Sequence, residues 1–212
     1  MEKIWKHNIV YKYKIKVLTG LHIGGSNEEL KIGGTDNAVI STRCVINGKP
    51  FDLPYIPGSS IKGKIGTLVE AVYPENKNVE ILFGHKKNTE EDIKTRLIIR
   101  DFTLNDDEIN KYLNDDLQLT EIKGENVIKP LSSKAIPRFI ERVLPGVEFY
   151  GEFIISIFND DNEDEFKKII KNGIELLEDS YLGGNGTRGY GKIKFELTTS
   201  EEIKDKSKYE GS

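Results

Sequence analysis

The sequence predicts an α+β fold whose main elements follow the order strand, helix, strand, strand, helix, strand. Three observations lead to this prediction. Residues 8–19 alternate lysines with apolar and aromatic side chains, which is the period of a half-buried strand with a basic outer face. Apolar residues recur at helical spacing after Pro57 and again over 162–179. A long apolar run over 147–158 has the length of a strand and precedes the second of these helices.

Between the first strand and the first helix, the sequence predicts a loop and a hairpin. Residues 20–37 hold five glycines and show little apolar periodicity, so we expect a loop there. Residues 39–56 predict a short hairpin that turns at Asn47-Gly48, a dipeptide that favours two-residue hairpin turns.

The rest of the chain supplies the remaining elements. They are a polar connection over 76–95, a core strand over 97–99, an acidic loop over 105–117, a basic excursion over 118–143, a strand over 147–158, a helix over 162–179 and a final strand over 187–198. This is the split βαβ, or ferredoxin-like, order that RNA-recognition modules also use. We expect one domain over 1–199 and a flexible charged tail over 200–212.

Charge is unevenly distributed along the chain. The formal net charge is −4, which argues against an indiscriminate nucleic-acid binder. Residues 1–70, however, hold 10 Lys and Arg against 6 Asp and Glu, while residues 71–212 hold 21 against 29. We therefore expect a polyanion-binding surface to draw mainly on the first third of the chain.

Composition excludes several classes of protein. The single cysteine, Cys44, rules out a disulfide framework, and three histidines are too few for a zinc cluster. No apolar run approaches the ~18 residues that a membrane span needs, and the N-terminus lacks the features of a signal peptide. These observations favour a reducing, cytoplasmic setting without a membrane partner.

The segment Gly58–Lys64 resembles a phosphate-binding loop, with the spacing G-x-x-x-x-G-K. The next residue is Ile65, where a hydroxyl ligand for magnesium belongs, so nucleotide hydrolysis is not supported. The segment does predict a helix start, with Ser59 or Ser60 as the N-cap and two nearby lysines. Free N–H groups there favour a phosphate, although a plain helix start with solvated lysines fits the same pattern.

A second glycine-rich segment, Gly183–Gly191, also matches G-x-G-x-x-G. A dinucleotide site needs this pattern between a strand and a helix, whereas here it follows a helix and precedes a strand, so we reject that function. Its permissive backbone suits close approach of a polyanion, with Arg188 adding charge. A helix C-cap followed by a glycine turn is the competing interpretation.

Asp36 and His22 share the glycine-rich loop over 20–37. A lone loop aspartate most often forms a turn, and the paired aspartates at 106–107, 115–116 and 160–161 fit solvated loops. Nothing in the sequence locates partners for a catalytic triad.

Taken together and in order, these segments resemble a known family. The matching segments are 21–25, 34–37, 54–64, 82–84, 100–101, 123–126, 137–138, 141–143 and the terminal glycine run. Over residues 8–198 the chain resembles the backbone subunits of type III-A CRISPR effectors (Csm complexes), within the RAMP superfamily.

The resemblance implies a modified RNA-recognition fold with loop insertions and an inserted thumb hairpin, here within about 118–143. It implies binding to a CRISPR guide RNA and a target RNA, stacking with further copies of the chain, and contact with other Csm subunits. It makes Asp36 the residue required for cutting target RNA. It also implies a divalent metal, Mg²⁺ or Mn²⁺, which a single Asp36 carboxylate holds only weakly until RNA phosphates and water complete the shell.

We expect contacts to RNA from the glycine-rich segments, the helix start and the basic excursion. The candidate residues are His22, Arg43, Ser59, Ser60, Lys62, Lys64, Asn126, Arg138, Gly184, Gly186 and Arg188. Guide binding without sequence preference relies on phosphate and 2′-OH contacts, so few exposed aromatic motifs are needed.

Two alternatives to a guide-binding, target-cutting subunit stay open. The chain is a purely structural RNA-binding filament subunit if cutting is done elsewhere. It is a guide-processing endonuclease of the same superfamily if it cuts repeat RNA alone and without metal.

Overall fold

The structure is a computed structural model, which describes residues 3–24, 38–46, 48–84, 95–114, 117–128 and 135–208. Its centre is a five-stranded antiparallel sheet in which four strands follow the order β4-β7-β1-β8, with β9 also paired to β1. These strands are β1 (Trp5–Val17), β4 (Leu97–Ile99), β7 (Glu148–Phe158), β8 (Ile193–Leu197) and β9 (Glu202–Asp205). Because β7 lies between β1 and β4, the sheet has the split βαβ arrangement that the sequence predicts.

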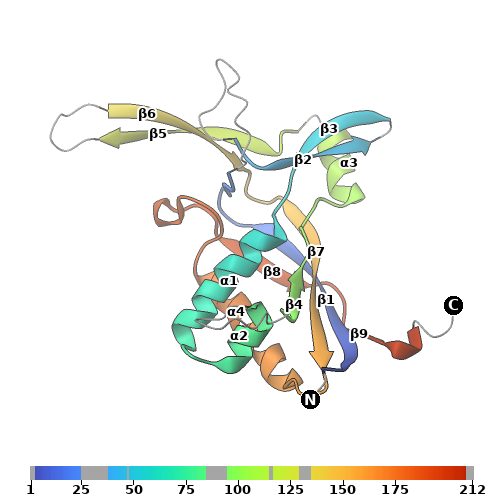
Figure 1. Cartoon of the computed structure of the whole chain (residues 1–212). Coiled ribbons are helices and arrows are strands. Elements are labelled where there is room, and N and C mark those ends of the chain that lie inside the picture. Colours follow the sequence, from blue (N-terminus) through green and yellow to red (C-terminus); the bar gives the residue numbers. More distant parts are fainter. Residues whose placement is uncertain are drawn as a thin grey trace.

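One face of the sheet is covered by helices (Figure 1). The helices are α1 (Gly58–Val72), α2 (Lys77–Phe83) and α4 (Glu163–Asp179), and α1 contacts both α2 and α4. Alternate β1 residues Ile9, Ile15 and Val17 are fully buried beneath them. Each such side chain stabilises the fold by about 1.5–3 kcal/mol. The other face of the sheet carries Lys12, Lys14 and Lys16 of β1, as predicted. It is not simply basic, because Lys14 pairs with Glu148 and Glu196 and Lys16 lies 3.9 Å from Glu148.

Two hairpins extend from this body. The first joins β2 (Ser41–Ile46) to β3 (Lys49–Pro54), as predicted from Asn47-Gly48. The second joins β5 (Thr120–Ile128) to β6 (Ala135–Val143) and projects away from the helices (Figure 1). It lies where the inserted hairpin is expected, and we call this β5–β6 hairpin the thumb. The short helix α3 (Asp106–Asn114) lies beside the first hairpin (Figure 1).

Two helices replace segments predicted as connections or loops. In the polar 76–95 segment, Asn76 accepts a hydrogen bond from the Asn78 N–H, and α2 then buries Val79, Leu82 and Phe83. In the acidic 105–117 segment, α3 begins with three acidic residues, which the positive end of the helix dipole favours. Capping by Asn76 and by Asn105 therefore outweighs the polar composition of the two segments, with a buried stripe in α2 and only the partly buried Ile109 and Tyr112 in α3.

The C-terminal segment also differs from the prediction. The sequence predicts a frayed charged tail from Ser200, whereas Glu202–Asp205 form β9. The reason is that β8 pairs with only part of β1 and leaves the rest of that edge open. Strand β8 pairs with Tyr13–Val17 of β1, and β9 pairs with His7–Val10 farther along the same strand. The short 3₁₀ turn Lys206–Lys208 follows.

No helix in the described ranges has the length and apolarity needed to cross a membrane.

Candidate RNA-binding interface

The start of α1 is closed by an aspartate from the neighbouring strand segment. Pro57 is the N-cap residue, and neither Ser59 nor Ser60 caps the helix, so that prediction is wrong. Instead, the Gly58 N–H donates to Oδ1 of Asp101 at 2.8 Å. A Cβ at Gly58 would lie 2.0 Å from the Ile99 carbonyl oxygen, so only glycine allows the helix to start this close to β4. A carboxylate already occupies part of the expected anion site.

The two lysines of this segment have different environments. Lys62 Nζ donates to Thr95 Oγ1 and to the Leu97 carbonyl, both at 2.9 Å, and burial lowers the pKa of Lys62 below its ordinary value. Lys64 Nζ instead lies over the Tyr181 ring, 3.9 Å from its centroid. Lys62 thus joins α1 to β4, while Lys64 faces the end of α4.

The glycine turn 183–191 packs against residues 20–22. The Gly184 N–H donates to the His22 carbonyl at 2.8 Å, and the Gly191 N–H donates to the Gly20 carbonyl at 3.1 Å. Gly191 has φ of +73°, and a Cβ there would lie 2.0 Å from the Leu182 carbonyl oxygen. Gly186 contacts the Tyr181 ring so closely that a Cβ would lie 2.0 Å from it. Through Tyr181, the turn and Lys64 come together.

His22 lies at the base of the thumb and is 7% exposed. Its Nδ1 lies 2.7 Å from the Glu141 carbonyl oxygen, so this nitrogen carries the proton and donates. The Glu141 carboxylate accepts from the Val39 N–H at 2.9 Å and from Thr120 Oγ1 at 2.8 Å. Val39 in turn bridges to Gly24. The described ends of the loop that carries Asp36 are therefore fixed beside the thumb base, while Asp36 itself lies outside the described residues.

A polar cluster joins the thumb to the glycine turn. Glu125 on β5 accepts from the Tyr190 O–H at 2.7 Å and from Arg188 Nη1 at 2.8 Å, while Lys123 Nζ lies 3.4 Å away. Lys123 and Arg142 lie over the Tyr190 ring, 4.7 and 4.9 Å from its centroid. The Tyr190 hydrogen bond lowers the pKa of Glu125, and the two cations add to this effect. Burial first, and then Glu125, raise the pKa of Tyr190 to about 12.

Sequence reasoning selected Arg188 from this cluster and missed Tyr190 and Glu125. The available signals were a tyrosine flanked by two glycines and a glutamate within the segment 123–126 that supported the family resemblance. Neither signal shows that the two side chains meet, because 65 positions separate them.

The three remaining predicted RNA contacts lie on the two hairpins. Arg43 is on β2, away from the thumb, and its Nε pairs with Asp52 at 3.2 Å. Arg138 is exposed on β6. The Asn126 side chain lies outside the part of the chain that the structure describes.

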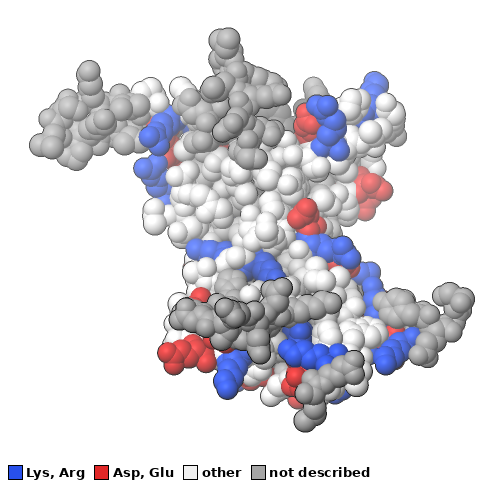
Figure 2. Space-filling model, in the orientation of Figure 1, with Lys and Arg blue, Asp and Glu red and all other residues white. Residues whose placement is uncertain are grey.

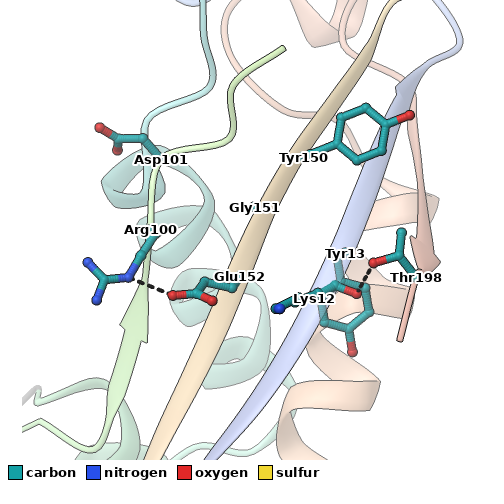
Figure 3. Close-up of a pocket in the computed structure, with 8 residues that line it drawn as sticks. All are labelled: Lys12, Tyr13, Arg100, Asp101, Tyr150, Gly151, Glu152 and Thr198. Carbon is teal, nitrogen blue, oxygen red and sulfur yellow. Dashed lines mark hydrogen bonds and ion pairs between the residues drawn. The ribbon is translucent and has the colours of Figure 1, made fainter. Parts of the chain in front are cut away.

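The open face of the sheet carries a shallow pocket of about 320 Å³ (Figure 3). Lys12, Arg100, Tyr150, Glu152 and Thr198 are among its lining residues. Arg100 Nε pairs with Glu152 at 2.7 Å, so the pocket balances much of its own charge. It is not a preformed anion site.

Basic side chains do not form one continuous stripe on the face drawn in Figure 2. Lys and Arg instead occur in separate groups over the thumb and over the body, with uncharged surface between them. This favours several phosphate contacts along an extended strand over one deep anion pocket.

The described residues do not make a metal site by themselves. Within these ranges no three His, Cys, Asp or Glu side chains gather as ligands. The Glu141 carboxylate, which contacts Val39 at the described end of the Asp36 loop, already accepts two hydrogen bonds. Glu141 therefore offers no preformed cation site at the thumb base.

An antiparallel sheet with helices on one face, a projecting hairpin and a glycine turn packed against that hairpin define an enlarged module of the RNA-recognition type. The family model of the RAMP superfamily matches residues 14–194. The chain belongs to this superfamily.

Curated relatives cover almost the whole chain. A Methanocaldococcus jannaschii protein named "CRISPR system Cms endoribonuclease Csm3" is 39% identical, over 98% of this chain and 86% of the relative. A Streptococcus thermophilus protein of the same name is also 39% identical, over 89% of this chain and 87% of the relative.

Solved structures show the same architecture. A crystal structure of the Csm3–Csm4 subcomplex in the type III-A CRISPR–Cas interference complex matches with a TM-score of 0.59 and 28% identity, covering 98% of this chain and 85% of that one. A chain from a type III-B Cmr-β complex bound to cognate target RNA has a TM-score of 0.62 at 21% identity, covering 94% of this chain and 61% of that one, and supports the fold alone.

Proposed function

We propose that this chain is a guide-RNA-binding backbone subunit of a type III-A CRISPR effector, and that it cuts complementary target RNA at regular intervals. Its partners are the guide RNA, the target RNA, further copies of itself in a filament and other Csm subunits. The relatives named as endoribonucleases support this proposal because they match nearly all of the chain. A complex that acts on RNA transcripts fits a cytoplasmic location.

One observation carries the proposal. Glu141 belongs to the thumb, and its carboxylate holds the Val39 N–H at the end of the loop that contains Asp36. A hairpin that can distort an RNA duplex is thereby joined to the loop proposed to act on the distorted strand.

Asp36 is the proposed catalytic residue. A nucleotide turned out of helical stacking can align its 2′-oxygen with the adjacent phosphorus. The 2′-oxygen then bonds to phosphorus, the bond to the 5′-oxygen breaks, and the 5′-oxygen takes up a proton. Asp36 either removes the 2′-OH proton or acts as a metal ligand, and the two roles stay open. Products carry a 5′-OH and a 2′,3′-cyclic or 3′-phosphate.

We also propose a requirement for Mg²⁺ or Mn²⁺. Because the described residues supply no preformed site, the ion would be held by Asp36 together with RNA phosphates and water. Affinity for the ion is therefore expected to rise when target RNA binds.

The test is Asp36→Asn in a complex reconstituted with guide and labelled target RNA, with and without a chelator. Asparagine is nearly isosteric, so assembly and guide binding should persist while cutting falls by about 10² or more, the scale of a lost acid–base group. Wild-type cutting by this variant would contradict the assignment and favour a purely structural subunit. Cutting of repeat RNA by the isolated chain in chelator would favour a guide-processing enzyme.

A further inference from the structure

The thumb is held from both of its faces. Successive residues of a strand point to opposite faces, and Glu125 and Glu141 therefore lie on opposite sides of the hairpin. Glu125 contacts the glycine turn, while Glu141 contacts Val39 at the end of the Asp36 loop. The thumb thus lies between the turn and Val39, the described end of the Asp36 loop, and its orientation affects both contacts.

On the turn side, one carboxylate receives two donors. The Tyr190 O–H reaches Oε1 of Glu125 at 2.7 Å, and Arg188 Nη1 reaches Oε2 at 2.8 Å. Tyr190 is 1% exposed, and only 11% of the Glu125 side chain is exposed, so water competes little for the tyrosine hydrogen bond. We call the Tyr190–Glu125 hydrogen bond the clamp.

The glycine turn that carries Tyr190, the donor of the clamp, is fixed to the body of the protein. Gly184 and Gly191 bond through their N–H groups to the carbonyls of His22 and Gly20. These bonds lie on either side of Tyr190 in the turn. Any movement of the Glu125 end of the thumb must therefore break or stretch the clamp.

The clamp lies far enough from the base of the hairpin to restrict the angle of the thumb. The main-chain contact between the thumb and the body, from Leu21 to Val143, lies at the base of the hairpin opposite Thr120. Glu125 is five residues farther along β5, which is roughly 16 Å at the usual rise of a strand. A hairpin fixed only at its base can tilt, whereas a second contact at this distance sets its angle.

We propose that Tyr190 and Glu125 are positioning residues that set the angle of the thumb, and thereby determine which phosphodiester of a bound target lies beside the Asp36 loop. This inference rests on the proposed function. Neither side chain needs to touch RNA, because both act through the thumb.

The test compares Tyr190→Phe with Tyr11→Phe in the reconstituted complex. Tyr11 is a matched control because its O–H also donates to a glutamate, Glu201, at 2.9 Å, but on β1 away from the thumb. The readouts are guide binding, the rate of cutting and the distribution of cut positions on an end-labelled target.

Tyr190→Phe should retain guide binding, lose about 10-fold or more of the cutting at the wild-type positions, and gain cuts at neighbouring phosphodiesters. A misplacement of about 1 Å is enough for such a loss. Tyr11→Phe should cut as the wild type does. Glu125→Gln gives a second test, because it retains the shape of the side chain and weakens only the charged contacts; it should broaden the cut positions to a smaller extent.

Unchanged cut positions and rates in both Tyr190→Phe and Glu125→Gln would overturn the inference while leaving the proposed function intact. A uniform loss at all positions without new cuts would also overturn it, since a merely structural role predicts that result. Absence of cutting by the wild-type complex would overturn the proposed function and the inference together.

Discussion

Gly58–Lys64 and Gly183–Gly191 both match glycine patterns of phosphate-binding loops in sequence, and they differ in what they contact. Gly58–Lys64 starts a helix, and its first N–H and its inner lysine are both used within the body, by Asp101 and by Thr95 and Leu97. Gly183–Gly191 forms a turn that contacts His22 and carries the two side chains that reach the thumb. The segment closest to a phosphate-loop pattern is therefore the more self-contained of the two.

The difference shows that a pattern of glycines and lysines does not itself identify an anion site. What matters is whether neighbouring segments already satisfy the donors. At the helix start they do so in part. At the turn the backbone is packed against residues 20–22, while the half-exposed Arg188 lies at the surface between turn and thumb.

The largest expected difference between the two segments is in the free energy of unfolding, when one glycine in each is replaced by alanine. Gly191→Ala should destabilise the protein by about 1–3 kcal/mol or more, because alanine strains a left-handed backbone and its Cβ would meet the Leu182 carbonyl. Gly63→Ala lies within α1 with nothing within 4 Å of the new Cβ, and should stabilise by about 0.5–1 kcal/mol. Urea unfolding of both variants measures this contrast. Equal effects would mean that the turn is not constrained as the structure has it.

The next largest expected difference is between Lys62 and Lys64, which should affect stability and RNA binding respectively. Lys62→Met should lower the free energy of unfolding by about 1–3 kcal/mol, because two acceptors lose a charged donor. Lys64→Ala should cost less stability but weaken RNA binding and reduce its salt dependence by about one unit of slope.

Unfolding curves and RNA titrations at several salt concentrations check both variants. A reduced salt slope in Lys62→Met with unchanged stability would place Lys62 at the RNA surface and contradict the internal role. An unchanged slope in Lys64→Ala would remove Lys64 from the interface.

The smallest expected effect is the loss, at acidic pH, of the stability that the Glu125 carboxylate contributes. The pKa of Glu125 is lowered in the folded protein from an ordinary value of 4.5, so its contribution to stability is complete above that pH and is lost as pH falls through the folded-state value. The stability difference between wild type and Glu125→Gln should therefore be constant near neutral pH and shrink below about pH 4.5. Unfolding series at several pH values check this. A difference that does not change in acid would show that the glutamate charge has no role in holding the thumb.

Much of the fold was predictable because its signals are local. The alternation in β1, the Asn47-Gly48 signal for the β2–β3 hairpin and the apolar stripe of α4 each lie within one segment, and each of the three elements is present in the structure. Helices α2 and α3 were missed because they are short and polar outside one stripe. Strand β9 was missed because it depends on an edge of β1 that the shorter β8 leaves open.

The site was predictable to a lesser degree. The sequence selected Arg188, Gly184 and His22, which the structure brings together around the glycine turn and the thumb base. It also selected Lys62 as an RNA contact and the two serines as caps. In the structure Lys62 instead bonds to Thr95 and Leu97, and Asp101 accepts from the first N–H of the helix. No local pattern contains that information.

The sequence by itself determined the order of the split βαβ elements, the β2–β3 hairpin and the family to which the chain belongs. The tertiary structure alone decided which polar groups are used internally and which join the thumb to the body. The physical reason is distance along the chain. The hydrogen bond between Lys62 and Thr95 joins residues 33 positions apart in the sequence. The Tyr190–Glu125 bond spans 65 positions and the His22–Glu141 bond spans 119 positions. Local propensity reaches only a few residues, whereas these hydrogen bonds form only after the sheet and helices have packed.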